Sequence, residues 1–248
     1  MMAKKTRIFM AILAVFVIAT AAQATVIRSE SLVPQQVIPQ VSTYQTTGAD
    51  MAGMEVTAFF SAAPSETVLW AASGADSGAA TGTGWSLSQA GDTFANAWTL
   101  FYQGGNNGLL TGFRIDGFAA GPGEVGVMFD RTFNGADGTP GSFRGRDFEY
   151  AGAEPAFDTF VMYEGGIGVA DEEPVGDEFR YLDVRFLTLP GFEDEFTSAP
   201  PQQGGLDGIE LRSINFFQDT NNPIVPEPMT LVFLGAGAAF VFTSRRIA

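Results

Sequence analysis

The chain has 248 residues, and its 13 Lys and Arg stand against 28 Asp and Glu, which gives a formal net charge of −15. Phosphates repel a chain this acidic, so nucleic-acid binding is excluded as an expected function. The absence of Cys and His excludes disulfides, thiol nucleophiles, Ser-His-Asp triads and the usual zinc and haem sites. With 46% hydrophobic residues and 23 Phe, the composition favours a packed core over disorder.

Residues 1–24 have the pattern of a secretory signal peptide. A basic start precedes an apolar stretch from Ile8 to Ala19, and an A-x-A site follows at Ala22 and Ala24. The apolar stretch forms roughly 18 Å of helix, which is short of the ~30 Å hydrocarbon core of a bilayer. We therefore expect an N-terminal signal helix that signal peptidase removes after Ala24, with an uncleaved anchor as the alternative.

The C-terminal residues 223–248 contain three further parts in a fixed order. Pro226, Glu227 and Pro228 come first, an uncharged stretch over 229–243 follows, and Arg245 and Arg246 come near the end. The prolines keep the chain extended before the stretch, and the arginines favour the cytoplasmic side. The stretch gives roughly 22 Å of helix, a short and weak transmembrane segment.

This tail resembles the PEP-CTERM sorting signal of Gram-negative bacteria, although Ile247 and Ala248 follow the arginines, where many tails of the family end in basic residues. The resemblance implies that an exosortase, a membrane-embedded protease, recognises Pro226, Glu227 and Pro228 and processes the tail near them. The chain would then be in the inner membrane only transiently, on its way to the cell surface or the extracellular matrix. An ordinary C-terminal membrane anchor is the alternative.

Between the two ends, short β-like runs alternate with turn residues, and no amphipathic helix of useful length is present. The pattern predicts an all-β fold with a single jelly-roll-like β-sandwich over 41–222, preceded by a linker or edge segment over 25–40. The Gly-rich segment from Ser73 to Gly84 is expected to be a flexible loop. The predicted strands are 54–60, 67–70, 85–88, 97–102, 110–118, 125–129, 157–163, 179–187 and 209–217.

A Gly-rich loop after 127–129 contains candidate calcium ligands. Asp130, Asn134 and Asp137 lie in this loop, and Asp147 lies beyond it. Their oxygens are the hard ligands that calcium prefers, and the glycines permit a tight backbone. Asp and Asn are also ordinary turn formers, so we expect this role and no cofactor, with calcium as the alternative. The spacing differs from that of an EF-hand.

Two other patterns favour structural roles. The segment Gly121–Gly126 fits G-x-G-x-x-G, but a proline lies inside it and a β-like run follows, so we interpret it as a turn. Trp70, Trp85 and Trp98 lie within β-like runs beside aliphatic residues, which favours core burial over a sugar-stacking platform.

The residues, together with what the PEP-CTERM resemblance implies about sorting, lead us to expect an exported, non-enzymatic protein of the cell surface or extracellular matrix. Its expected role is structural, adhesive or weakly polysaccharide-binding, with signal peptidase and exosortase as processing partners. The alternative is a secreted carbohydrate-active enzyme that uses an Asp/Glu pair. Its candidate carboxylates cluster in Pro- and Gly-punctuated stretches at Asp171-Glu172-Glu173, Asp177-Glu178 and Glu193-Asp194-Glu195.

Overall fold

The computed structural model describes residues 25–30, 34–118, 126–132, 137–155, 157–170, 178–187, 205–208 and 212–223. All helical or extended elements within these ranges are strands, so the predicted all-β fold is confirmed. None of the described residues forms a helix long and apolar enough to cross a membrane. The predicted signal peptide with Ala22 and Ala24, and the tail with 226–228, 245 and 246, lie outside the described residues.

The strands form two sheets. In the larger sheet the strand order is β3-β16-β11-β14-β10-β4-β5, and β13 pairs with β14, β1 and β2. In the smaller sheet the order is β12-β15-β9-β8-β7-β6. The larger sheet comprises β1 (Val26–Glu30), β2 (Pro34–Ile38), β3 (Val41–Thr43), β4 (Glu55–Phe60), β5 (Glu66–Leu69), β10 (Leu110–Asp116), β11 (Met128–Asp130), β13 (Asp158–Val169), β14 (Glu178–Leu187) and β16 (Asp219–Pro223). The smaller sheet comprises β6 (Ala71–Ala72), β7 (Ser77–Gly82), β8 (Trp85–Ala90), β9 (Trp98–Tyr102), β12 (Glu149–Tyr150) and β15 (Ser213–Phe217).

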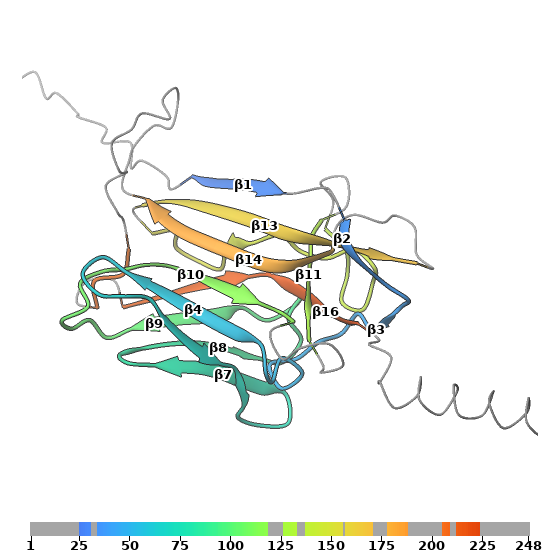
Figure 1. Cartoon of the computed structure of the whole chain (residues 1–248), viewed down its shortest axis with the longest axis horizontal. Helices are drawn as coiled ribbons and strands as arrows, with labels where there is room; N and C mark the ends of the chain where they lie inside the picture. The colour runs from blue at the N-terminus through green and yellow to red at the C-terminus, as the bar shows by residue number, and fades with distance from the viewer. Residues whose placement is uncertain are drawn as a thin grey trace, which may run out of the picture.

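The N-terminal part of the described chain adds two strands to the long strand β13. β1 pairs with it in parallel beside Thr159, and β2 pairs in parallel further along, beside Val169. Figure 1 shows β1, in blue, running along β13. The backbone N–H of Thr25 donates to Asp158 Oδ1 at 2.9 Å, and the N–H of Thr159 donates to the Thr25 carbonyl at 2.9 Å. Thr25 is therefore attached to the start of β13 by two hydrogen bonds.

The two sheets pack face to face around one aromatic core, because residues on alternate positions of each strand point inward. Phe216 on the smaller sheet lies at its centre. The ring of Phe216 stacks on Phe148 at 4.7 Å, on Phe113 of the larger sheet at 5.5 Å and on Trp98 at 6.0 Å between centroids. These contacts join the sheets into a β-sandwich-like fold.

The three tryptophans lie in this core, as predicted. Trp70 and Trp85 are each 2% exposed, and Trp98 is fully buried. Each indole N–H has an acceptor: Trp70 donates to the Gly48 carbonyl at 2.7 Å, Trp85 to Glu66 Oε2 at 2.7 Å, and Trp98 to the Gln218 carbonyl at 2.9 Å. Burial of the rings therefore leaves no indole N–H unsatisfied.

The prediction of a flexible loop over Ser73–Gly84 was wrong, because β7 (Ser77–Gly82) pairs with β8 through six successive positions. Its glycines make room for the tryptophans. A Cβ on Gly78 would lie 2.2 Å from Trp70 Nε1, and a Cβ on Gly82 would lie 2.2 Å from Trp85 Nε1. These glycines allow close approach of large rings to the strand, which is one of the recognised uses of glycine inside a sheet.

Replacing Trp98 by Phe tests the role of the indole N–H. The variant keeps an aromatic ring but leaves the Gln218 carbonyl without its donor in the core. We expect it to lower the free energy of unfolding by about 1–3 kcal/mol, measured by urea denaturation. The control is Val37→Ala on β2, where the side chain is 67% exposed and the expected change is within about 0.5 kcal/mol. Equal losses in the two variants would contradict this account.

Candidate functional site

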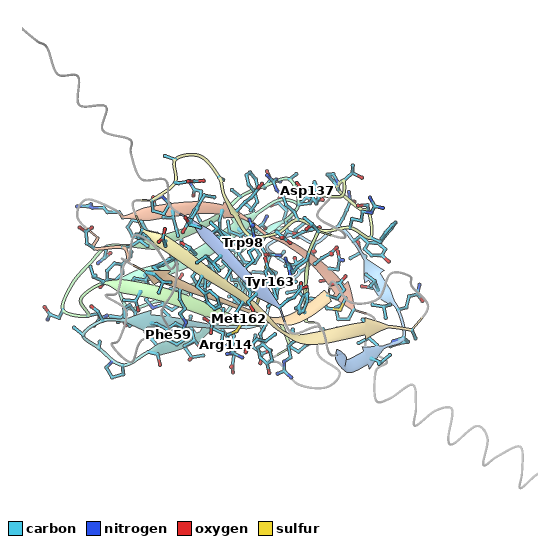
Figure 2. The ribbon with its side chains drawn as sticks, turned by 90° about the horizontal axis from the view of Figure 1, so that it is seen from above. Phe59, Trp98, Arg114, Asp137, Met162 and Tyr163 are labelled. Atoms are coloured by element: carbon cyan, nitrogen blue, oxygen red, sulfur yellow. The ribbon has the colours of Figure 1, made fainter. Side chains whose placement is uncertain are left out.

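The outer face of the larger sheet carries an ordered array of charged and aromatic side chains on β4, β10, β14 and β13. The register places Gly112 between Phe59 and Arg185, Arg114 beside Asp183, and Asp183 beside Met162. Figure 2 shows Phe59, Arg114 and Met162 toward one side of the molecule and Asp137 toward the other. We call this surface the arginine–aromatic face, and it comprises Phe59, Arg114, Asp116, Met162, Glu164, Arg180, Tyr181, Asp183 and Arg185.

Arg185 crosses one strand of the sheet to reach an aromatic ring. Its guanidinium carbon lies 3.5 Å from the centroid of Phe59, although β10 runs between their two strands. Gly112 makes this crossing possible, since a Cβ there would meet the Val184 carbonyl at 2.2 Å and the Arg185 Cδ at 3.2 Å. The missing side chain at 112 therefore leaves room for the Arg185 side chain to reach the ring.

A buried carboxylate anchors two of the arginines. Asp183 is 3% exposed and accepts from Arg185 Nε at 2.5 Å and from Arg185 Nη2 at 3.0 Å. Arg114 Nη1 lies 3.6 Å from the same carboxylate, and its Nη2 lies 3.0 Å from Glu164 Oε2. Asp183 thus orients both guanidinium groups, while the side chains of Arg114 and Arg185 stay 36% and 39% exposed.

Tyr181 lies against two further guanidinium groups. Arg114 and Arg180 lie 4.5 Å and 4.7 Å from the centroid of its ring. Arg180 also donates two hydrogen bonds of 2.7 Å to Asp116, and this bonding raises the pKa of Arg180. Gly165 on β13 has a φ of +67°, a conformation that favours a bulge. Beside it, Arg180 and Tyr181 are both partly exposed, so the strict alternation is interrupted.

These groups form a nearly charge-balanced surface of fixed donors, fixed acceptors and ring faces. Three arginines, Arg114, Arg180 and Arg185, stand with the carboxylates of Asp116, Glu164 and Asp183. Guanidinium groups donate hydrogen bonds, carboxylates accept them, and aromatic rings offer apolar faces. Sugar hydroxyls both donate and accept, and the C–H faces of pyranose rings are apolar, so this chemistry suits a polysaccharide.

The calcium candidates fall into separate surroundings. Asp130 is fully buried on β11, where its Oδ2 accepts from Asn221 Nδ2 at 2.7 Å, and the same nitrogen donates to Glu178 Oε1 at 2.6 Å. Asp137 is exposed, and Asn134 lies outside the described residues. Within the ranges that the structure describes, no three Asp or Glu side chains gather in a group that could hold a metal.

Asp147, the fourth candidate, is engaged by arginines. Its two oxygens accept from Nε and Nη2 of Arg131, both at 3.0 Å, and the Thr132 N–H donates to it at 3.0 Å. Burial alone raises the pKa of Asp147, but the hydrogen bonds from Arg131 and Thr132 outweigh it, so the pKa is lowered. Calcium at the four predicted positions stays a prediction.

The pKa of Asp219 is shifted upward, in the opposite direction to that of Asp147. It is 2% exposed, at the start of β16, and burial raises its pKa to about 7. Its Oδ1 accepts from Thr93 Oγ1 and from the Thr220 N–H, both at 2.8 Å, which only partly compensates for the burial. This carboxyl group lies too deep to meet a substrate.

The arginine–aromatic face was missed in the sequence, although one signal was present. The strand Phe179–Leu187 has charged residues at 180, 183 and 185, which breaks a simple inside–outside alternation.

Of the predicted acidic clusters, only Glu178 is described, and it is buried beside Asn221. Comparison with family models, with curated proteins and with solved structures found no match. The function is therefore argued from the residues of this chain.

Asp219→Asn tests the buried carboxyl. The folded-state pKa near 7 exceeds the usual 3.8, so the unfolded chain loses this proton first as the pH rises. The stability of the unmodified protein relative to the variant should therefore fall by roughly 2–4 kcal/mol between about pH 4 and pH 7 and then level off. Denaturant unfolding of both proteins across this range measures the difference, in which the other carboxyl groups cancel. A difference that is constant with pH would refute the assignment.

Proposed function

We propose that this chain is an exported protein of the cell surface or extracellular matrix of a Gram-negative bacterium that binds neutral polysaccharide through its arginine–aromatic face. In this proposal a PEP-CTERM tail and an exosortase direct its sorting, and signal peptidase removes residues 1–24. The observation that carries the binding role is the row-by-row placement of guanidinium, carboxylate and ring groups on one sheet face.

The sorting part rests on the two ends of the sequence. A basic start, a short apolar stretch and an A-x-A site stand at one end, and Pro226-Glu227-Pro228, an uncharged stretch and two arginines stand at the other. Each part alone is common, but their fixed order in one chain matches the resemblance described above. The jelly-roll-like connectivity of the sandwich belongs to the same proposal.

The preference for neutral polysaccharide follows from charge. The chain has a formal net charge of −15, so an anionic polymer is repelled at long range. The three arginines of the face are matched by carboxylates within ion-pair distance, and little positive potential is left to attract uronates or sulfates. Hydrogen bonds and ring contacts with hydroxylated, uncharged sugars carry no such penalty.

Binding is favoured over glycoside hydrolysis. A hydrolase needs one carboxyl group protonated near neutral pH and a second one ionised beside it. On the arginine–aromatic face, Asp116, Glu164 and Asp183 each have a guanidinium group as their ion-pair partner, so none of the three stands alone as a hydrolase carboxyl group would. Asp219 has the raised pKa of an acid but is buried. The described carboxylates thus suit recognition of hydroxyl groups.

Arg185→Ala tests the binding face. Loss of this guanidinium group removes donors to a ligand and uncovers Phe59, and we expect at least tenfold weaker binding, equivalent to about 1.4 kcal/mol. Affinity electrophoresis in gels that contain neutral or uronate-rich polysaccharides measures the effect. The matched control is Arg212→Ala, an exposed arginine outside this face, for which binding should not change. Binding that is equal in both variants, or confined to the anionic polymers, would rule the proposal out.

The double variant Pro226→Ala, Pro228→Ala tests sorting. A flexible, helix-compatible junction should no longer be recognised, so the full-length chain should accumulate in the inner membrane. Immunoblots of membrane and surface fractions report the outcome, with Pro64→Ala, Pro140→Ala as the control pair. Normal processing of the first pair would show that these prolines do not direct sorting, whatever the sugar-binding result.

A further inference from the structure

The smaller sheet presents an outer face of a different kind. Its strands β6, β7, β8, β9 and β15 contain no Asp, Glu, Lys or Arg at any position. By contrast, β10, β13 and β14 of the larger sheet carry charged residues on each strand. In a chain with a net charge of −15, a run of five neighbouring strands without charge is a surface property that needs a physical reason.

A partly exposed aromatic ring lies on this face. Phe101 is 38% exposed and is paired in register with Ser86 on one side and Ser213 on the other. The next row contains Ser88, Thr99 and Asn215, and the Thr99 hydroxyl donates to Asn215 Oδ1 at 2.8 Å. The neighbours of the ring are therefore small and uncharged, so another flat surface can approach it closely.

Charged residues return at the edge of this uncharged face. Glu149 on the edge strand β12 pairs with Arg146, whose guanidinium carbon lies 3.5 Å from the ring centroid of Phe217. Arg212 directly precedes β15, and Asp76 directly precedes β7. A centre without charge, an aromatic residue within it and a charged rim are three features that this face shares with protein–protein interfaces.

We infer that the uncharged face is a self-association surface, through which a second copy of this chain packs sheet against sheet. The absence of charged residues on this face is the reason why we infer that its partner is a second copy of this chain. In a two-fold contact each residue near the axis meets its own copy, so any charge there opposes a like charge. The strands β6–β9 and β15 avoid this repulsion because they contain no charged residue.

The size of the face sets the strength of the association. Five strands about 4.8 Å apart and about five residues long make a patch of roughly 20 by 17 Å. This is less than the ~800 Å² per partner of a standard stable interface, so we expect weak dimers that form only at high protein concentration. Such contacts become effective where many copies are held on one surface. The inference does not depend on polysaccharide binding or on sorting.

Ser88→Glu tests this surface against Ala62→Glu, which adds the same charge on an exposed turn outside it. The full chain in mild detergent is measured by sedimentation velocity over a range of concentrations. We expect the unmodified chain and Ala62→Glu to dimerise alike, more strongly at ~0.5 M than at ~0.05 M salt because screening reduces the net repulsion. Ser88→Glu should weaken the dimer at least tenfold.

The second variant, Phe101→Ser, removes the exposed ring without adding charge and should also weaken the dimer severalfold. Circular dichroism confirms that each variant is folded. Dimerisation of Ser88→Glu that equals that of Ala62→Glu would overturn the inference and assign the association to another surface, such as the C-terminal tail. A monomeric unmodified chain at every concentration and salt would overturn it as well.

Discussion

The burial of three indole rings between two sheets is the constraint on which the rest of this structure depends. Each ring is too large for a strand crowded with side chains, and each N–H needs an acceptor in a region without water. Glycines at 78 and 82 provide the space for Trp70 and Trp85. Backbone carbonyls and Glu66 provide the acceptors. The close approach of β7 to Trp70 and Trp85 follows from the first requirement.

Because the core occupies the inner faces of both sheets, the outer faces are left for interactions with other molecules. They differ in chemistry. The larger sheet presents paired arginines, carboxylates and rings that Gly112 and Gly165 help to place, whereas β6–β9 and β15 of the smaller sheet present hydroxyl groups, alanines and Phe101 and contain no charged residue. If the two proposals made above both hold, one sandwich would bind a hydroxylated polymer on one side and a second copy on the other, and would link polymer chains in a matrix.

Features that depend on neighbouring residues within one strand were predictable from the sequence. Features that depend on contacts between separate strands were not. Alternation along single strands predicted the all-β fold and the burial of the tryptophans. The segment Ser73–Gly84 was misread, because its glycines serve rings at 70 and 85 rather than a flexible loop. The arginine–aromatic face depends on the register of four strands, and Arg185 meets Phe59 across an intervening strand. Nothing in the spacing of these two residues along the chain indicates that contact.

The attachment of Thr25 to β13 has a consequence for maturation. In the uncut chain its nitrogen is an amide that donates to Asp158 at 2.9 Å. If signal peptidase cuts after Ala24, the same atom becomes a protonated α-amine, and a hydrogen bond from an uncharged amide to the Asp158 carboxylate turns into an ion pair. A surface pair of this kind contributes modestly, about 0–1 kcal/mol. Removal of the signal peptide would then add an ion pair between the new N-terminus and Asp158, at the place where β1 begins to pair with β13.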